Sequence, residues 1–252
     1  MLDVVLLEYT RGAQEVIAAA AKLCYYDKSV SELKGEFTKQ KASKFTKMLR
    51  EIGHESPMEH ASFTFGIDGV SRACMAQITR HRIASFNVQS QRYVNKSAFK
   101  FVIPPAIEKD KEAKALFIEA MTEANTKYLK LAEILKQQYI KKMKTDGVLE
   151  AEASSKAEKL AIEDARYVLP NACETRMIVT MNARELLHFF ELRCCNRAQW
   201  EVRGVAFAML RHVKVVAPEL FEKAGPNCLR GACKEGKMSC GKAEEIKKIY
   251  SF

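Results

Sequence analysis

Long hydrophobic runs and secretion signals are missing from this sequence of 252 residues. No run of about 18 or more apolar residues occurs, so we expect no transmembrane helix. The opening stretch MLDVVLLEYT lacks a basic start and a small-residue cleavage site, and therefore predicts a β-strand rather than a signal peptide. Repeats and long linkers are also missing. Because 48% of the residues are hydrophobic, including 13 Phe and 8 Tyr, the sequence predicts a packed core and excludes a disordered protein.

Two nucleotide-binding fingerprints are missing as well. No G-x-G-x-x-G follows a predicted strand, so we expect no Rossmann dinucleotide site. Near the C-terminus, GACKEGK matches the spacing G-x-x-x-x-G-K. However, Met238 follows Lys237 where a phosphate-binding loop needs Ser or Thr, and no strand precedes the match. A phosphate-binding loop of that kind is therefore excluded.

Cysteine occurs eight times, but never as the C-x-x-C pair typical of zinc sites. Without a secretion signal, these cysteines indicate a reducing compartment and thiols or metal ligands rather than disulfides. Cys228, Cys233 and Cys240 lie in a C-terminal tail rich in Gly and Lys. Their thiolates could bind Zn²⁺, but three ligands are one short of a structural site. We expect a partly ordered tail with free thiols and no metal, with a zinc-stabilised interaction module as the alternative.

The charge balance favours anionic partners. The sequence has 41 Lys and Arg against 31 Asp and Glu, a net charge of +10. Lysine runs such as KKMK are typical of a solvated surface, whereas the arginines cluster in short polar loops. No basic stripe interleaved with exposed aromatics is visible, so the pattern favours a nucleotide pocket. A basic nucleic-acid-binding protein is the alternative.

Hydrophobic periodicity predicts both strands and helices. Alternating apolar residues predict strands at 2–9, 62–67 and 175–182. Helical spacing predicts helices at 16–24, 45–52, about 70–79, 109–144, 183–192 and 198–216, with another before YVLP. In the 109–144 helix, the candidate buried positions are Leu116, Ala120, Tyr128, Leu131, Leu135 and Tyr139. The predicted fold class is α+β, a mixed sheet flanked by long helices, with an inserted helical subdomain at about 107–165.

The stretch RHRIASFNVQSQRY, from Arg80 to Tyr93, crowds polar recognition groups together. Arginine presents a planar fork that can grip a phosphate or a pyrimidine carbonyl through two hydrogen bonds. The Ser, Asn and Gln side chains between the arginines add donors and acceptors that can read a base edge. The stretch therefore predicts a nucleotide site.

The same stretch resembles the signature of the flavin-dependent thymidylate synthases, because Arg80-His81-Arg82 is followed after seven residues by Ser90. Four further blocks resemble that family in the same order: HESPMEHASFTF (54–65), RYVLP (166–170), MNARELLHFFELR (181–193) and AQWEVR (198–203). The resemblance implies that family's fold and a catalytic domain over residues 1–222. Residues 223–252, the Cys/Lys/Gly-rich tail, lie outside it.

The resemblance implies a reaction in which dUMP, methylenetetrahydrofolate and NADPH give dTMP, tetrahydrofolate and NADP⁺. FAD would be the redox carrier, and the protein would supply orientation and electrostatics. The resemblance also implies a homotetramer with active sites between subunits and no cysteine nucleophile. We expect a cytoplasmic enzyme with no nucleic-acid or membrane partner.

The resemblance assigns two catalytic residues. Arg193 is implied to lie against the uracil ring and to stabilise negative charge as N3 ionises. His54 is implied to lie near flavin and substrate. The implied dUMP-binding residues are Gln77, Arg80, Ser90, Gln91, Arg92, Arg166 and Arg193. Ser90 is a nucleophile by type, but it is assigned to binding because the family's chemistry requires no covalent enzyme–uracil bond.

The implied flavin-contacting residues are Ser56, Glu59, Arg80, His81, Arg82, Val88, Asn182, Arg184 and His188. Some positions depart from the family's pattern. Val88 stands where relatives often carry Glu or Gln, and the neighbouring Gln89 is the candidate replacement for that contact. His188 stands where Asn can occur and Arg197 where His can occur, and both side chains keep the ability to hydrogen-bond.

Overall fold

The computed structural model describes residues 2–27, 29–92 and 99–251, without the side chain of residue 34. Tyr93, the last residue of the RHRIASFNVQSQRY stretch, lies outside the described residues. The chain divides into two compact units. The first unit comprises Gly69–Met75 and Val88–Arg176, and the second comprises Leu2–Asp68, Ala76–Asn87 and Met177–Phe252.

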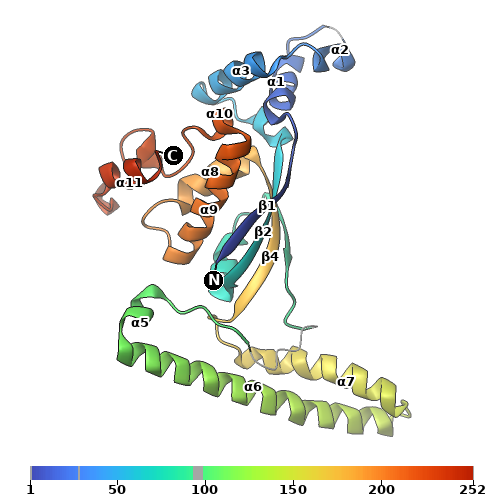
Figure 1. Ribbon diagram of the computed structural model, residues 1–252. Helices are drawn as coiled ribbons and strands as arrows, with labels where there is room; N and C mark the ends of the chain where they lie inside the picture. Colours follow the sequence, from blue (N-terminus) through green and yellow to red (C-terminus); the bar gives the residue numbers. More distant parts are fainter. Residues whose placement is uncertain (1, 28, 93–98, 252) are drawn as a thin grey trace. The chain divides into compact units, whose positions relative to one another are not determined.

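Four strands form one sheet in the order β1-β2-β4-β3 (Figure 1). The strands are β1 (Asp3–Tyr9), β2 (Ser62–Ser71), β3 (Ala84–Val88) and β4 (Glu174–Asn182). β1 pairs antiparallel with β2, and a β-bulge between Leu6 and Glu8 shifts the register. The predicted α+β class is confirmed, and the sheet is small. The mixed sheet predicted from the sequence, with parallel as well as antiparallel strand pairs, stays a prediction.

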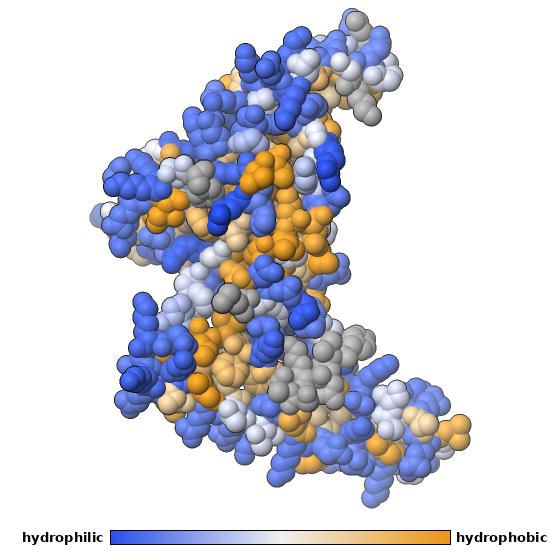
Figure 2. Space-filling view, viewed as in Figure 1, coloured by the Kyte–Doolittle hydropathy of each residue, from blue (hydrophilic) through white to orange (hydrophobic). Residues whose placement is uncertain are grey.

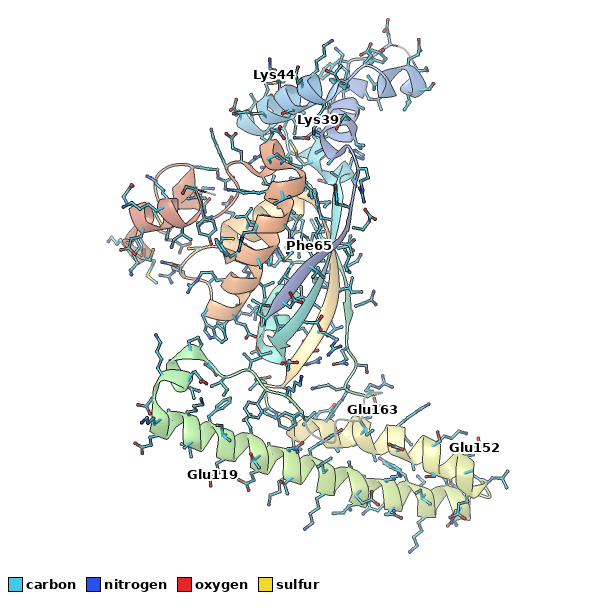
Figure 3. The ribbon with its side chains drawn as sticks, in the orientation of Figure 1. Lys39, Lys44, Phe65, Glu119, Glu152 and Glu163 are labelled. Carbon is cyan, nitrogen blue, oxygen red and sulfur yellow. The ribbon has the colours of Figure 1, made fainter. Side chains whose placement is uncertain are left out.

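Period-two burial builds the core of the second unit. Phe63, Phe65 and Ile67 on β2 are fully buried, whereas the residues between them are more exposed, because successive side chains of a strand point to opposite faces. Phe65 lies within this packing (Figure 3). Phe221 packs edge-on against Phe63, with ring centroids 5.4 Å apart, and also against Phe190. These aromatic contacts join the sheet to the helices that carry the candidate site.

The helices over the sheet are α8 (Ala183–Arg193) and α9 (Trp200–Val216). Asn182 caps α8, since its side-chain oxygen accepts a hydrogen bond of 2.9 Å from the Glu185 backbone N–H. α9 packs on β1, where Nε2 of His212 lies 2.8 Å from the carbonyl oxygen of Val4. The predicted helices at 183–192 and 198–216 are therefore present, and the 62–67 strand is longer than predicted.

Helices before β2 complete the second unit. They are α1 (Ala13–Leu23), α2 (Val30–Lys34), α3 (Lys39–Glu51) and the 3₁₀ turn η1 (Ser56–His60). α1 packs against both α3 and η1. Gly53 has a φ of 79°, a left-handed conformation that suits glycine, and it ends the α3 segment as predicted.

The C-terminal tail is packed rather than loose. After α10 (Pro218–Phe221), it forms the turns η3 (Asn227–Leu229) and η4 (Gly236–Met238) and the helix α11 (Ala243–Ile249), which packs on η3. Tyr250 is buried, and its hydroxyl donates a 3.1 Å hydrogen bond to the carbonyl oxygen of Cys194. All eight cysteines are free thiols.

The first unit contains a long helical hairpin. After α4 (Arg72–Ile78) and α5 (Pro105–Lys109), α6 (Lys111–Thr145) runs beside α7 (Glu150–Ala165), followed by η2 (Arg166–Val168) (Figure 1). Ala153, Ala157 and Ala161 on α7 are buried, and their small side chains allow the two helices to approach closely. Within the described residues, no helix is both long enough and apolar enough to cross a bilayer.

The predicted burial on α6 is only partly right. Tyr128 is 1% exposed, and Leu131, Leu135 and Tyr139 are half-buried. Leu116 is 67% exposed and Ala120 is also exposed, so those two predictions are wrong. The physical reason is which face is covered: Phe117 and Met121 pack with Phe99 and Cys173, and Leu116 and Ala120, one position earlier, lie beside that face.

Candidate active site

A cavity of about 570 Å³ in the second unit gathers the motif residues. Its walls come from η1, from the segment after α4, from α8 and from the tail. Eight predicted site residues line it: Glu59, Arg80, His81, Arg82, Asn182, Arg184, His188 and Arg193. α4 ends at Ile78, so the arginines and histidine of the RHR motif leave the helix end and reach the cavity. Arg184 and His188 are one helical turn apart on the exposed side of α8.

A buried carboxylate, imidazole and guanidinium are connected in this cavity. Nδ1 of His81 lies 2.8 Å from Oε1 of Glu185, and their side chains are only 4% and 7% exposed. Nε of Arg193 donates a hydrogen bond of 3.0 Å to Nε2 of His81. Nη2 of Arg193 also donates to the carbonyl oxygen of Gln77, 3.4 Å away. The predicted residues Gln77, His81 and Arg193 are thus brought together, with Gln77 contributing through its backbone.

The hydrogen bonds fix the protonation state of His81. Because the Arg193 guanidinium can only donate, Nε2 of His81 must accept, and the ring proton then lies on Nδ1, which donates to Glu185. Burial lowers the pKa of His81 below its usual value; the hydrogen bond and charge of Glu185 raise it, while Arg193 and His188 lower it further. The net direction is downward. His81 is therefore a neutral imidazole between Glu185 and Arg193.

The rim of the cavity is charged and exposed. Arg184 pairs with Glu59 and, at 3.7 Å, with Glu55. The hydrogen bond to Glu59 raises the pKa of Arg184 above its usual value. Arg80, Arg82 and His188 are exposed beside this network. The rim thus presents several guanidinium groups that can bind phosphate oxygens.

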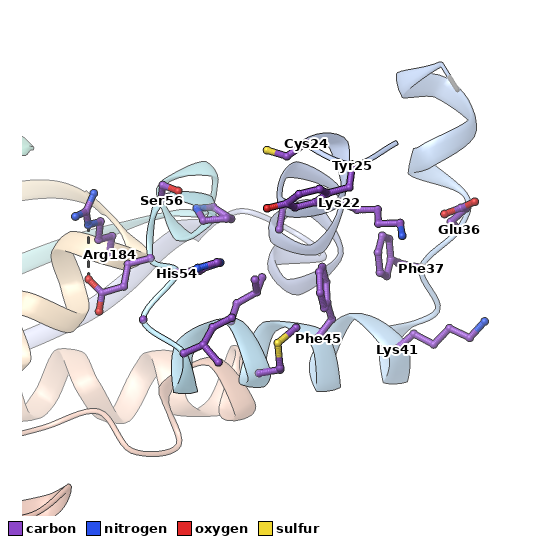
Figure 4. Close-up of a pocket in the computed structure, with 17 residues that line it drawn as sticks. Lys22, Cys24, Tyr25, Glu36, Phe37, Lys41, Phe45, His54, Ser56 and Arg184 are labelled. Atoms are coloured by element: carbon purple, nitrogen blue, oxygen red, sulfur yellow. Dashed lines mark ion pairs between the residues drawn. The ribbon is translucent and has the colours of Figure 1, made fainter. Parts of the chain in front are cut away.

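A second cavity, of about 1210 Å³, shares Glu55 and Arg184 with the first (Figure 4). It contains two predicted residues, His54 and Ser56, near the arginine. Its remaining walls come from α1, α3 and the segments next to them, and they combine apolar and aromatic side chains with the charged Lys22, Glu36 and Lys41. Phe37 and Phe45 stack there, with ring centroids 5.9 Å apart. A flat aromatic ligand would find apolar and aromatic surface in this cavity and cations at its edge.

Comparisons with known proteins identify the family. A family described as "Thymidylate synthase complementing protein" matches residues 5–219. A protein of Clostridium tetani named "Flavin-dependent thymidylate synthase" is 53% identical over 249 residues, which cover 99% of this chain and 97% of the relative. This chain belongs to the flavin-dependent thymidylate synthase family.

Two more relatives of that name support the assignment. The protein of Geobacter sulfurreducens is 44% identical over 251 residues, covering 99% of this chain and 98% of the relative. The protein of Pyrococcus abyssi is 38% identical over 247 residues, covering 94% of this chain and 91% of the relative. The family resemblance inferred from the five sequence blocks is therefore confirmed.

Five residues that the flavin-dependent thymidylate synthase motifs assign to the site belong to the other unit. They are Val88, Ser90, Gln91, Arg92 and Arg166, which belong to the first unit and do not line either cavity described above. The Ser90 hydroxyl accepts a hydrogen bond from the Arg92 backbone N–H, and Nε of Arg92 lies 3.1 Å from a carboxylate oxygen of Glu163. The Arg166 guanidinium lies over the Tyr167 ring, 6.0 Å from its centroid. Their assignments stay predictions.

The motifs missed four charged residues of the cavity: Glu55, Glu185, Glu191 and Arg230. Glu185 lies two helical turns before Arg193 on the same side of α8, and a carboxylate on an otherwise apolar helix face is a signal that could have found it. Nη2 of Arg230 donates to a carboxylate oxygen of Glu191 and comes from the C-terminal tail. No feature of the sequence predicts that contact.

The residues present fit the flavin that the family name implies. The donor set combines exposed guanidinium groups, suited to a pyrophosphate, with an adjoining apolar and aromatic cavity, suited to a fused ring. Arg80, Arg82, Arg184 and His188 supply cations or donors, and Ser56 and Asn182 supply neutral polar groups. Among the described residues, no group of three or more His, Cys, Asp or Glu side chains is already arranged to hold a metal ion.

Proposed function

We propose that this protein is a flavin-dependent thymidylate synthase that converts dUMP to dTMP by reductive methylation, with methylenetetrahydrofolate as one-carbon donor and NADPH as reductant. The observation that carries the proposal is the gathering of eight motif residues around one cavity in which a buried His81–Glu185 pair holds Arg193. The names of the relatives support it. The proposed compartment is the cytoplasm, consistent with eight free thiols.

Arg193 is proposed to stabilise negative charge on the uracil ring as N3 loses its proton. The hydrogen bond from its Nε to His81 fixes the plane of the guanidinium. The neutral imidazole carries this orientation from Glu185 to Arg193. A pre-oriented cation stabilises a developing anion without reorganising during the reaction. His81 and Glu185 are positioning residues in this account.

FAD is proposed to bind the charged rim and the adjoining apolar cavity, through Ser56, Glu59, Arg80, Arg82, Asn182, Arg184 and His188. When bound, it supplies the redox chemistry that links NADPH to the methylation. His54 lines the apolar cavity together with Ser56 and is proposed to lie near flavin and substrate. His81 is assigned to flavin contact as well, in addition to its support of Arg193, and Val88 stays a proposed contact from the first unit.

We propose a homotetramer whose active sites lie between subunits. Val5 and Leu7 on β1 and Ile178 on β4 are exposed apolar residues, and Figure 2 shows apolar side chains gathered over the strands. Such a patch is typical of a protein–protein contact. Gln77, Arg80, Ser90, Gln91, Arg92 and Arg166 are proposed to bind dUMP, and a shared site allows those of the first unit to come from another subunit.

The proposed catalytic domain is residues 1–222, with a helical insertion at about 107–165 and the tail 223–252 added to it. The family match over residues 5–219 supports this division. No nucleic-acid or membrane partner is part of the proposal.

A spectrum and a tritium assay test the proposed function together. The purified protein is expected to be yellow and to release FAD on denaturation. Tritium should leave dUMP labelled at C5 only when methylenetetrahydrofolate and NADPH are both present. A colourless protein that neither binds added FAD nor releases tritium would contradict the proposal. Salt-sensitive binding to long DNA or RNA without preference for dUMP would support the nucleic-acid alternative instead.

A further inference from the structure

Four of the eight cysteines line one small cavity that shares Glu191, Leu192 and Arg193 with the candidate active site. The cavity has a volume of about 220 Å³ and lies between the turn that follows α8 and the C-terminal tail. Cys195 comes from the turn, and Cys228, Cys233 and Cys240 come from the tail. The tail contains three cysteines, and Cys195 supplies a fourth thiol to the same cavity. It is far away in sequence, so only the fold brings it to the other three.

Polar contacts hold the tail in place around this cavity. Nη1 of Arg197 donates a 2.7 Å hydrogen bond to the carbonyl oxygen of Met238, and Nε of Arg197 lies 3.4 Å from a carboxylate oxygen of Glu235. Nζ of Lys234 lies 3.1 Å from Oε1 of Glu191 on α8. The three tail thiols are therefore carried by a segment that is fixed to α8 and to the turn bearing Cys195.

We propose that Cys195, Cys228, Cys233 and Cys240 form a structural site for one Zn²⁺ ion. Four thiolates are a complete tetrahedral ligand set for zinc, and a closed set leaves no position for substrate. On binding, four S–H groups lose their protons to solvent and four Zn–S bonds form, with no change of oxidation state. The resulting centre is doubly negative, and the cavity lining also carries Arg197 and Lys234, each paired with a carboxylate.

No group of three metal-ligand side chains is preformed among the described residues, so the thiol side chains must rearrange to reach coordination distance. Sites of this kind ordinarily take their final geometry only when the metal binds.

A zinc ion held by these four thiols would join two segments that are far apart in the sequence, since Cys195 and the tail cysteines line the same cavity. The site would then fasten the tail to the residues that directly follow Arg193.

Zinc analysis of the purified full-length chain tests the proposal. Protein prepared with a reductant and without chelator should contain about one zinc ion per chain. Cys195→Ser and Cys228→Ser should each lose the zinc, whereas Cys24→Ser, which removes an exposed thiol outside this cavity, should keep it. In the native zinc-bound protein, the four proposed ligand thiols should resist a thiol reagent. Removal of the zinc by a chelator should make them reactive.

Reconstitution covers the case in which a Ser variant does not fold. Chelator-treated wild-type chain should bind Co²⁺ with the absorption of a tetrahedral thiolate site, and Zn²⁺ should bleach that signal. A chain that binds neither ion, zinc that persists in both Ser variants, or iron with acid-labile sulfide in place of zinc would overturn the proposal. These readouts do not depend on FAD or dUMP, so they are independent of the proposed catalytic function.

Discussion

Nε of Arg193 donates a hydrogen bond to Nε2 of His81, which lies 3.0 Å away and is itself bound to Glu185. The neutral ring thus transmits orientation from the buried Glu185 carboxylate to the Arg193 guanidinium. The first three predictions follow from this arrangement.

Arg193→Lys should reduce turnover about 100-fold or more, because lysine keeps the charge but loses the planar fork and the Nε–H that His81 receives. FAD binding should be almost unchanged. Tritium release from labelled dUMP measures the first effect, and the flavin absorption of the purified variant measures the second. Wild-type turnover in this variant would remove Arg193 from its proposed role.

Glu185→Gln and Glu185→Ala should differ. The Gln side-chain oxygen can still accept the Nδ1 proton of His81, so turnover and folding should largely survive. Ala leaves a buried N–H without an acceptor, which should lower the free energy of unfolding by about 1–3 kcal/mol and also reduce turnover. Urea unfolding and tritium release measure both. Equal behaviour of the two variants would show that the hydrogen bond has no positioning role.

The lowered pKa of His81 predicts a pH dependence. Above 6.5 the ring is neutral in the folded and unfolded chain, so its contribution to stability is complete. Below 6.5 the unfolded chain takes up the proton first, and this contribution is lost progressively until the pH reaches the lower folded pKa. Turnover should also fall below pH 6.5, since a protonated His81 ring cannot accept the hydrogen bond from Arg193. The groups that face the ring are Glu185, Arg193 and His188.

A pH–rate profile between about pH 4.5 and 8 checks this expectation against the usual histidine pKa. The comparison is His81→Gln, whose amide cannot titrate and whose oxygen can accept from Arg193. In that variant, the part of the decline in turnover at low pH that is due to His81 should be absent. An identical acid decline in both proteins would assign it to another group.

Arg184→Ala should weaken FAD binding and leave the midpoint of thermal unfolding almost unchanged. Its ion pairs with Glu55 and Glu59 are exposed, and exposed pairs add little stability. Titration of apoprotein with FAD, followed by flavin fluorescence, gives the affinity. Lys156→Ala, which breaks an exposed pair with Glu152 on α7, is the matched control and should bind FAD normally. Equal affinities in the two variants would remove Arg184 from the flavin site.

Tyr250→Phe should lower the free energy of unfolding by about 1 kcal/mol, because the buried carbonyl of Cys194 loses its donor. Tyr250→Ala should cost about 3–5 kcal/mol, since it also removes the ring that packs edge-on against Phe207. Denaturant unfolding curves measure both changes. Wild-type stability in Tyr250→Ala would mean that the tail is not part of the folded unit.

Local sequence patterns predicted the helices that carry the site. They did not predict contacts between segments that are far apart in the sequence. The helix before Arg80 and the helix of the MNARELLHFFELR block were predictable because their apolar residues repeat with helical spacing. The pairing of His81 with Glu185 joins residues 104 positions apart. Burial of a carboxylate depends on which partner the fold supplies, and a sequence pattern does not record that partner.

The same reason explains the errors on α6. Leu116 has the right spacing for a buried face, but the fold covers the neighbouring face of Phe117 and Met121 instead. The tail cysteines likewise share their cavity with Cys195, which precedes a whole helix, α9, before the chain returns. Spacing rules describe residues of one segment and do not record which distant residues the fold brings to them.

Arg230 gives the tail a place in the same cavity as Arg193. A protein truncated after residue 219, where the family match stops, would keep every recognisable motif. It would nevertheless lose a wall of the cavity, the partner of Glu191 and the ring that packs on Phe207. For this protein, the stretch that the family model matches is shorter than the stretch that must be expressed to obtain an intact pocket.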